Sequence, residues 1–217
     1  MKTAFVLGST GQDGSYMCEL LLKKNYKVYA LVRKSATGNT KNIDHLINNK
    51  KVVDKNFFLV KGDLNDHNSI RNIISSVKPN EIYNFADQDH VGWSFAIPSY
   101  SLMTTSHSLI NILESIKSTN KNIKYFHPLS SNMFGKTKSK LQDENTSFNP
   151  QSVYAISKVT CYHLSNLYRD VYGLKIYNTI YSNHESPRRS EEYVTKKIVK
   201  HVSEIFYKKR LKLELGD

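Results

Sequence analysis

The chain is poor in cysteine and in long apolar runs, and each shortage excludes a class of protein. Its 217 residues contain two cysteines, Cys18 and Cys161, which are too few and too far apart for a disulfide framework or a cysteine-based metal site. The first apolar run ends at Gly8, and no run approaches the roughly 20 apolar residues that a membrane helix needs. We therefore expect a protein of a reducing compartment, cytoplasmic, with no membrane span and no metal.

Acidic residues are also scarce, because 31 Lys and Arg stand against 19 Asp and Glu and give a formal net charge of +12. Such a charge is compatible with a nucleic acid, a membrane surface or a phosphate-bearing small molecule as partner. The lysines occur singly or in pairs, such as Lys23-Lys24 and Lys208-Lys209, and never in a block of five. We attribute them to a compositional habit and expect no nucleic acid and no membrane as partner.

Short β-rich runs alternate with amphipathic helical stretches along the chain. Strands are predicted at residues 3–7, 27–32, 56–60, 81–85, 124–127, 174–181 and 211–215, and helices at 15–24, 69–77, 100–118, 152–171 and 194–208. This alternation predicts an α/β fold, a Rossmann-type doubly wound parallel sheet with helices on both faces. Long loops are expected at 34–42 and 136–151. Because the sequence stops just after the 211–215 run, we expect the front part of a longer protein.

A glycine-rich turn joins the first predicted strand to the first helix. It contains Gly8, Gly11 and Gly14 at a spacing of three residues. Glycines there permit a tight turn and let backbone N–H groups approach a pyrophosphate at the helix N-terminus. The turn predicts a dinucleotide site, and the alternative is a plain tight turn between strand and helix.

Two further strand ends bear on the identity of the cofactor. Arg33 and Lys34 end the second predicted strand, where an NAD-selective site carries a carboxylate for the ribose 2′-hydroxyl. A cation suits a 2′-phosphate instead, so these residues favour NADP. Asp63 and Leu64 follow the third strand and are candidates for the adenine edge, although a helix cap or turn explains Asp63 equally well.

Tyr154 and Lys158 are one helical turn apart, which places a phenol and an ammonium group on one face of a helix. A nearby cation favours the phenolate, so the tyrosine can act as a general base toward a sugar hydroxyl. Tyr193 and Lys197 have the same spacing, so the spacing alone proves little. The first pair is favoured because it follows a strand that ends in two hydroxyl residues, Ser130-Ser131.

Short segments in order along the whole chain carry a family resemblance. They are residues 8–16, 31–35, 39–40, 43–46, 62–64, 94–95, 97–98, 134–136, 154–155 with 158, and 183–189. By these segments the chain resembles the extended short-chain dehydrogenase/reductases and, within them, the GDP-mannose 4,6-dehydratase family. The resemblance implies an NADP-binding Rossmann domain over residues 1–182. Residues 183–217 would begin a nucleotide-sugar domain that is largely missing.

The resemblance also implies a reaction on GDP-mannose or a related nucleotide sugar. NADP takes hydride from C4 while Tyr154 accepts the hydroxyl proton, a base removes the C5 proton, water leaves from C6, and the hydride returns to C6. The implied catalytic positions are Ser130, Asn132, Tyr154 and Lys158. The implied cofactor contacts are Gly8, Thr10, Gly11, Gln12, Asp13, Gly14, Arg33, Asp63, Leu64, Phe85, Ala86, Gln88, Tyr154, Lys158, His184 and Arg189. The implied substrate contacts are Asp89, Ser130, Asn183 and Lys197. A homo-oligomer, a dimer or tetramer, is implied as well, in which the loop at 33–40 reaches a neighbouring subunit's cofactor.

Several departures from the family pattern change the expected chemistry. The family's Ser-Thr-Ser-Glu-Leu-Phe-Gly-Lys reads Leu-Ser-Ser-Asn-Met-Phe-Gly-Lys at 129–136, so Asn132 replaces the glutamate that removes the C5 proton. An amide has no useful basicity, and loss of a general base costs on the order of 10²- to 10⁴-fold in rate. Asp87 and Asp89 stand where the family has small Ala and Ser, so they either repel the ligand or let Asp89 take over acid/base work. Trp93 replaces a small aliphatic residue and reshapes the pocket.

We therefore expect a GDP-mannose 4,6-dehydratase-like, NADP-dependent lyase whose elimination step is impaired. Two alternatives stay open. The first is an oxidoreductase or epimerase that keeps the C4 chemistry of a GDP-sugar without dehydration. The second is a non-catalytic, cofactor-binding fragment.

Overall fold

The computed structural model describes residues 1–36, 38–138, 140–209 and 212–215. The chain divides into two units, Met1–Ser182 and Asn183–Asp217, and each is considered by itself. The strands of the first unit are β1 (Thr3–Leu7), β2 (Lys27–Val32), β3 (Phe57–Lys61), β4 (Glu81–Asn84), β5 (Lys124–Ser130) and β6 (Lys175–Tyr181). These six strands form one sheet in the order β3-β2-β1-β4-β5-β6. All neighbours are parallel, which is the strand order of a Rossmann fold.

Helices connect the strands of the first unit. They are α1 (Gln12–Lys23), α2 (Asp44–Ile47), α3 (His67–Val77), α4 (Trp93–Ala96), α5 (Pro98–Leu102), α6 (Ser108–Thr119) and α7 (Val153–Tyr172). A π-helical segment, Met103–His107, joins α5 to α6, and 3₁₀ turns lie at Lys41–Ile43 and Ser131–Met133.

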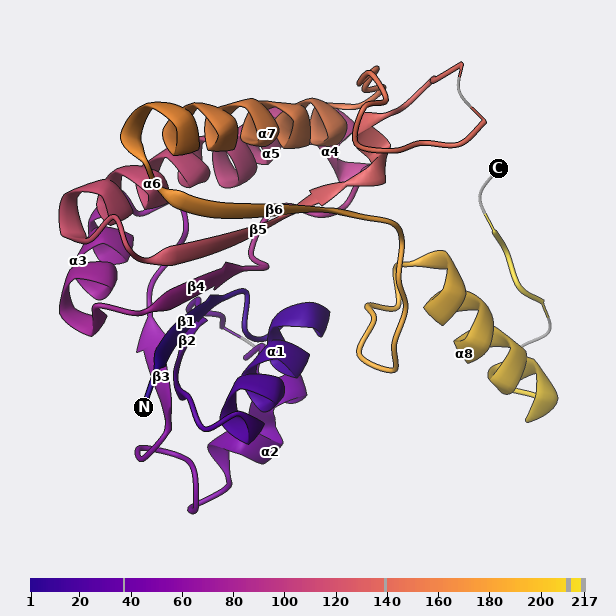
Figure 1. Cartoon of the computed structure of the whole chain (residues 1–217). Coiled ribbons are helices and arrows are strands. Elements are labelled where there is room, and N and C mark those ends of the chain that lie inside the picture. The colour runs from indigo at the N-terminus through magenta and orange to yellow at the C-terminus, as the bar shows by residue number, and fades with distance from the viewer. Residues whose placement is uncertain (37, 139, 210–211, 216–217) are drawn as a thin grey trace. The chain divides into compact units, whose positions relative to one another are not determined.

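Side chains of β1 alternate between the two faces of the sheet and show why helices cover both. Phe5 and Leu7 belong to one core cluster together with buried residues of α3, α6 and α7. Ala4 and Val6 belong to the other, with Cys18 of α1. Successive strand residues point to opposite faces, so a strand that is apolar from Ala4 to Leu7 needs a helical layer on each side. Figure 1 shows α1 and α2 on one side of the sheet and α3, α6 and α7 on the other.

Local sequence signals set the ends of the site-bearing helices. The Asp66 carboxylate caps α3 by accepting hydrogen bonds from the backbone N–H of Asn68 and Ser69. The Ser152 hydroxyl caps α7 by accepting one from the N–H of Ala155 at 3.1 Å. Gly173 ends α7 in the left-handed conformation, with φ of +71°, which costs glycine little. The Ser152 and Gly173 caps thus fix the residues at which α7 begins and ends.

The predicted α/β fold and parallel sheet are confirmed, and three local predictions are corrected. Residues 212–215 form no strand, while position 211 lies outside the described residues. A strand needs a partner, and the described residues of the second unit contain none. The helix predicted at 100–118 is a longer run that starts at Pro98 and contains the π-helical segment. The long loop at 34–42 is partly helical, because a 3₁₀ turn begins at Lys41.

The second unit contains one helix in its described residues, α8 (Val194–Phe206). No residue of α8 is buried, and the helix carries several exposed apolar side chains, Val194, Val199, Val202 and Phe206 among them. None of the helices in the described ranges combines the length and the apolar character that a membrane crossing requires.

Candidate active site

The glycine turn after β1 is closed by direct backbone packing. Gly8 has φ of +72°, and a Cβ atom there would lie 2.3 Å from the carbonyl oxygen of Phe85. A Cβ on Gly14 would lie 2.1 Å from the carbonyl oxygen of Gly8, so α1 starts against the end of β1. The Gly11 N–H donates to the Gly8 carbonyl at 3.0 Å. Glycine is required at both ends of the turn for steric reasons alone.

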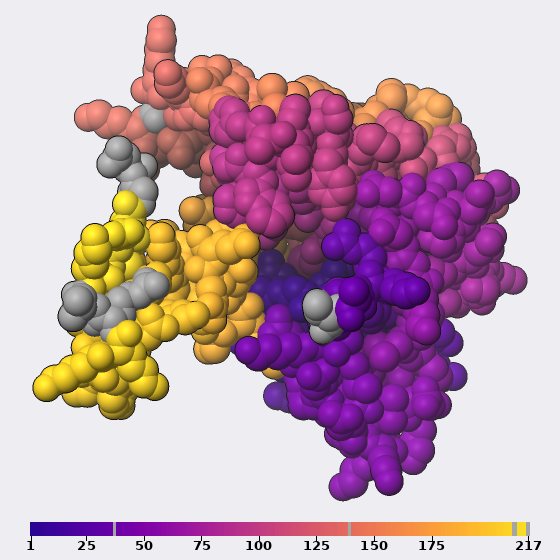
Figure 2. All heavy atoms as spheres, turned by 180° about the vertical axis from the view of Figure 1, so that it is seen from behind, coloured from indigo at the N-terminus to yellow at the C-terminus, as the bar shows by residue number. Residues whose placement is uncertain are grey.

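The start of α1 fits a dinucleotide pyrophosphate. Gly11 is the N-cap residue and, as a glycine, supplies no side-chain cap. The first backbone N–H groups of a helix have no intrahelical partner and attract anions. Gln12 and Asp13 of this turn hydrogen-bond each other, Gln12 Nε2 to Asp13 Oδ1, at 3.2 Å. In Figure 2 the indigo N-terminal part lies recessed between the magenta and purple parts of the surface.

Two contacts hold the glycine turn in place, and neither was predicted from the sequence. The buried Ser9 hydroxyl donates to the carbonyl oxygen of Leu31 in β2 at 2.7 Å. Asn42 Nδ2 donates to the carbonyl oxygen of Thr10 at 3.0 Å, which links the segment after β2 to the turn. Their sequence signal is weak, since a serine and an asparagine in loops have many other uses.

The residues at the strand ends that were predicted to meet the adenosine part of the cofactor differ in exposure and in hydrogen bonding. Arg33 follows β2, is exposed, and donates from Nη1 to the Tyr100 hydroxyl at 3.3 Å. Asp63 follows β3, and its Oδ1 accepts from the Asn65 N–H at 2.9 Å in a local turn. Leu64 is buried in the core. A turn role is thus visible for Asp63, and Arg33 is an exposed cation at the end of β2.

The segment after β4 carries Phe85, Ala86, Gln88 and two aspartates that differ in burial. Asn84 Oδ1 accepts from the Ala86 N–H at 3.1 Å, and Asn84 Nδ2 donates to Asp87 Oδ1 at 3.1 Å. The Gln88 side chain is buried and donates to the His90 carbonyl at 2.9 Å. Asp89 is exposed, whereas the Asp87 side chain is only 5% exposed. The expectation of two carboxylates facing a ligand is therefore corrected for Asp87, which is directed into the protein.

Ser130 and Asn132 lie where β5 ends in a 3₁₀ turn. Ser130 is buried and Asn132 is exposed. The Ser130 Oγ accepts hydrogen bonds from the backbone N–H and from Nδ2 of Asn132, each at 3.2 Å. The serine hydroxyl is thus held at the carboxyl edge of the sheet, where ligands bind in this fold.

Tyr154 and Lys158 lie in the first two turns of α7, and both are buried. Lys158 Nζ is 5.8 Å from the centroid of the Tyr154 ring. It donates to the carbonyl oxygen of Pro128 in β5 at 2.8 Å and to Oδ2 of Asp87 at 2.6 Å. The lysine therefore joins α7, the end of β5 and the segment after β4 at one point.

The electrostatics of this point are set by burial and by Asp87. Burial alone lowers the pKa of Lys158, but the attraction of the Asp87 carboxylate, followed by that of Tyr154, outweighs it and raises this pKa. His127 of β5 is fully buried, which lowers its pKa to about 4, although Asp87 acts in the opposite direction. His127 Nε2 is 3.4 Å from Asp87 Oδ2 without forming a hydrogen bond. Sequence reasoning missed Asp87 and His127 as neighbours of Lys158, because only the parallel pairing of β4 with β5 brings them together.

The remaining predicted site residues belong to the second unit. Asn183 and His184 are exposed at its start. The Arg189 guanidinium lies 3.4 Å over the ring of Tyr193 and 3.6 Å from Glu185, and Lys197 lies in α8. In the first unit, Asn132 contacts Ser130, and Lys158 lies beside Tyr154 and contacts Pro128, two residues before Ser130. Asn183, His184, Arg189 and Lys197 are described only within the second unit.

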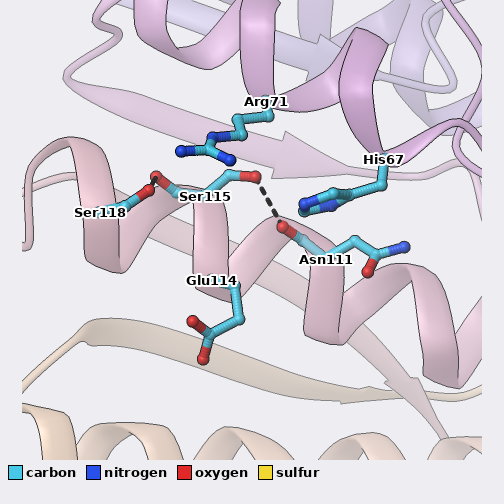
Figure 3. A pocket seen from close by; sticks show the side chains of 6 residues that line it. All are labelled: His67, Arg71, Asn111, Glu114, Ser115 and Ser118. Carbon is cyan, nitrogen blue, oxygen red and sulfur yellow. Dashed lines mark hydrogen bonds between the residues drawn. The ribbon is translucent and has the colours of Figure 1, made fainter.

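A separate hollow lies between α3 and α6 (Figure 3). It is lined by His67, Arg71, Asn111, Glu114, Ser115 and Ser118. Glu114 is already engaged there, since it accepts from Lys117 and from the Tyr168 hydroxyl, each at 2.7 Å. None of the predicted site residues lines this hollow. The described ranges also hold no group of three or more His, Cys, Asp or Glu side chains suited to a metal ion.

Comparison of the sequence with known proteins identifies the family that the chain matches. The family model for GDP-mannose 4,6 dehydratase matches residues 5–217. GDP-mannose 4,6 dehydratase 1 of Arabidopsis thaliana is 42% identical over 100% of the chain, which covers 61% of that relative. GDP-mannose 4,6 dehydratase of Drosophila melanogaster is 39% identical over 100% of the chain, with 55% of that relative covered. The chain thus spans about 55% to 61% of the length of these curated relatives.

Solved structures support the fold. The dTDP-glucose 4,6-dehydratase DesIV of Streptomyces venezuelae, bound to NAD and TYD, has a TM-score of 0.82 at 23% identity, covering 93% of this chain and 62% of that one. UDP-glucose 4-epimerase of Brucella ovis, bound to NAD, has a TM-score of 0.73 at 20% identity, covering 84% of this chain and 52% of that one. At this identity the likeness concerns the fold alone.

Proposed function

Because the chain belongs to the GDP-mannose 4,6-dehydratase family, we propose that it takes part in NADP-dependent chemistry at C4 of a nucleotide sugar, GDP-mannose or a relative. The observation that carries the proposal is the meeting of Lys158 with the end of β5, 2.8 Å from the Pro128 carbonyl and 5.8 Å from the Tyr154 ring. In support, the phenol and the ammonium group lie one turn apart on α7, and the lysine reaches β5 two residues before Ser130. Residues 1–182 hold the cofactor, and residues 183–217 begin the substrate part.

Each residue of this group has a role that its chemistry allows. Tyr154 takes the proton of the C4 hydroxyl, with the Lys158 ammonium group 5.8 Å from the centroid of its ring. Ser130 orients the same hydroxyl, and Lys158 supplies the positive charge and one remaining N–H donor. The nicotinamide cofactor, when bound, supplies the hydride acceptor. The start of α1 would hold its pyrophosphate, and Arg33 would hold the 2′-phosphate that distinguishes NADP from NAD.

Dehydration depends on a base that removes the C5 proton, and Asn132 stands at the position of that base. A neutral amide cannot accept this proton at ordinary pH. The proposed enzyme therefore oxidises C4 efficiently and eliminates water slowly. The same observation favours a second function, a C4 oxidoreductase or epimerase of a GDP-sugar that does not dehydrate its substrate.

Proton exchange tests these two functions together. The native protein that contains these 217 residues is incubated with GDP-mannose and NADP in deuterated water, and C4, C5 and C6 are followed by NMR. We expect a 4-keto sugar or C4 exchange without efficient loss of water from C6. The Tyr154→Phe variant should lose all of this chemistry while still binding NADP. Rapid formation of a 6-deoxy-4-keto sugar by the parent protein would show that another group, with Asp89 the first candidate, acts as the base.

The proposal includes a cytoplasmic homo-oligomer, a dimer or tetramer, in keeping with the family resemblance. Light scattering on the purified protein measures the mass directly. A monomer at micromolar concentration would contradict this part of the proposal and would leave the C4 chemistry to be judged by the NMR experiment.

A further inference from the structure

The ammonium group of Lys158 has a carboxylate partner inside the protein. Lys158 Nζ lies 2.6 Å from Asp87 Oδ2, and both side chains are 5% exposed. A second N–H of the ammonium group is used by the Pro128 carbonyl at 2.8 Å. The other carboxylate oxygen of Asp87 accepts from Asn84 Nδ2 at 3.1 Å. Both ions are therefore held on two sides by fixed partners, and one N–H of Lys158 is left for a ligand.

We propose that Asp87 is a positioning residue that acts through Lys158, holding its ammonium group charged and in place beside Tyr154. The inference rests on the proposed function for its catalytic meaning, but the ion pair itself can be tested without catalysis. A buried charge without a partner is costly, so Asp87 decides whether Lys158 keeps its charge in this position.

The other groups around Lys158 cannot replace Asp87 as a counter-ion. His127 on β5 is neutral above about pH 5, because burial lowers its pKa to about 4. Burial raises the pKa values of the Cys161 thiol on α7 and of the Tyr125 hydroxyl on β5, so both stay protonated. Tyr154 on the same helix is the proposed acceptor of the substrate proton, so its charge changes during the reaction and it is not a permanent counter-ion. Asp87 is thus the carboxylate on which the charge of Lys158 depends.

The pH dependence of unfolding tests this directly. In the parent, the pKa of folded Lys158 lies above its ordinary value of 10.5, so the stability that its charge contributes is lost only as pH rises beyond that value. In Asp87→Asn, burial acts without the carboxylate and lowers this pKa. The folded state then binds fewer protons than the unfolded state between about pH 8 and 10.5, so stability relative to the parent rises with pH there.

The quantity compared is the unfolding equilibrium constant of the variant divided by that of the parent. We expect this ratio to fall at least about tenfold between about pH 8 and 10.5. For a single proton, the fall cannot exceed about tenfold per pH unit. Asp170→Asn is the matched control, because it removes the same charge from an exposed position on α7; its ratio to the parent should stay constant. A constant ratio for Asp87→Asn as well would overturn the proposal.

A double variant covers the case in which Asp87→Asn does not fold. Asp87→Asn with Lys158→Met removes both charges and keeps the volume of the lysine stem. We expect it to fold and to be more stable than Asp87→Asn alone, because the unpaired ammonium group is gone. If the double variant is unfolded, or is no more stable than the single one, Asp87 has a packing role and the proposal is wrong.

The catalytic part is tested by the pH profile of C4 oxidation with NADP and GDP-mannose. The parent should show no alkaline loss up to about pH 10, whereas Asp87→Asn should lose activity at least about one pH unit lower, as Lys158 gives up its proton. An unchanged profile would overturn the positioning role. A parent without C4 chemistry contradicts the proposed function, and the unfolding experiments then decide on the ion pair by themselves.

Discussion

The Asn132 side chain donates a hydrogen bond from Nδ2 to Oγ of Ser130 at 3.2 Å, and its backbone N–H reaches the same oxygen at 3.2 Å. With two donors directed at Oγ, the hydroxyl hydrogen of Ser130 is free to point to a substrate. A carboxylate at position 132 has no hydrogen to donate and would instead compete for that hydroxyl hydrogen. The Asn132 amide therefore leaves the Ser130 hydroxyl available as a donor.

The proposed function, in which position 132 lacks a base, predicts the effect of introducing an acid there. Asn132→Glu should raise dehydration of GDP-mannose by on the order of 10²- to 10⁴-fold, because it supplies a base for the C5 proton. The measurement is the rate at which the 6-deoxy-4-keto product forms in deuterated water. Asn132→Gln is the control, since it has the length of Glu and no basicity; an equal gain in both variants would refute the assignment.

Arg33 should decide between the two dinucleotides. Arg33→Ala should weaken NADP binding at least about tenfold and leave NAD binding unchanged, as expected for a lost contact to a charged phosphate. Calorimetric titration of each variant with both cofactors measures the change. Lys27→Ala removes a charge from the exposed opposite end of β2 and should affect neither cofactor. Equal affinity of the parent for NADP and NAD would contradict this assignment.

Substitution of Gly8 and of Gly173 can distinguish the cost of backbone strain from the cost of steric overlap, because the two residues have nearly the same φ. Gly8 and Gly173 have φ of +72° and +71°, but a Cβ on Gly8 would lie 2.3 Å from the Phe85 carbonyl oxygen, whereas nothing lies within 4 Å of one on Gly173. Gly173→Ala should cost about 1 kcal/mol of unfolding free energy, from the backbone conformation alone. Gly8→Ala should cost several times more, because the turn must open. Urea unfolding compares them, and similar losses would refute the close packing of this turn.

The buried His127 should make the free energy of unfolding depend on pH in the acid range. Its folded pKa of about 4 lies below the ordinary value of 6.5, so the stability from the neutral, buried ring is complete above about pH 6.5 and is lost as pH falls toward 4. This loss amounts to about 3 kcal/mol. His127→Gln should flatten this part of the stability curve, while His163→Gln, at an exposed position on α7, should leave it in place. Parallel curves for His127→Gln and the parent would contradict the low pKa.

The order and type of the main elements followed from local patterns. The apolar runs of β1 and β2, the glycines at 8, 11 and 14, and the serine before α7 each carry their signal within a few residues. The family resemblance extended this to the position of Tyr154 and Lys158. The strand predicted at 211–215 was wrong over 212–215, because leucines that alternate with charged residues make a strand only when another strand is present to pair with them.

The partnership of Lys158 with Asp87 was decided by tertiary structure alone. The two residues are 71 positions apart in the chain, and no spacing rule connects a segment after one strand with a helix that follows another. Pairing of β4 with β5 places Asp87 next to His127, and the packing of α7 against β5 brings Lys158 to the same point. Sequence determined which chemical groups the site contains. Burial and the parallel sheet determined which of them are charged and which face each other, because both depend on distances that only the folded chain creates.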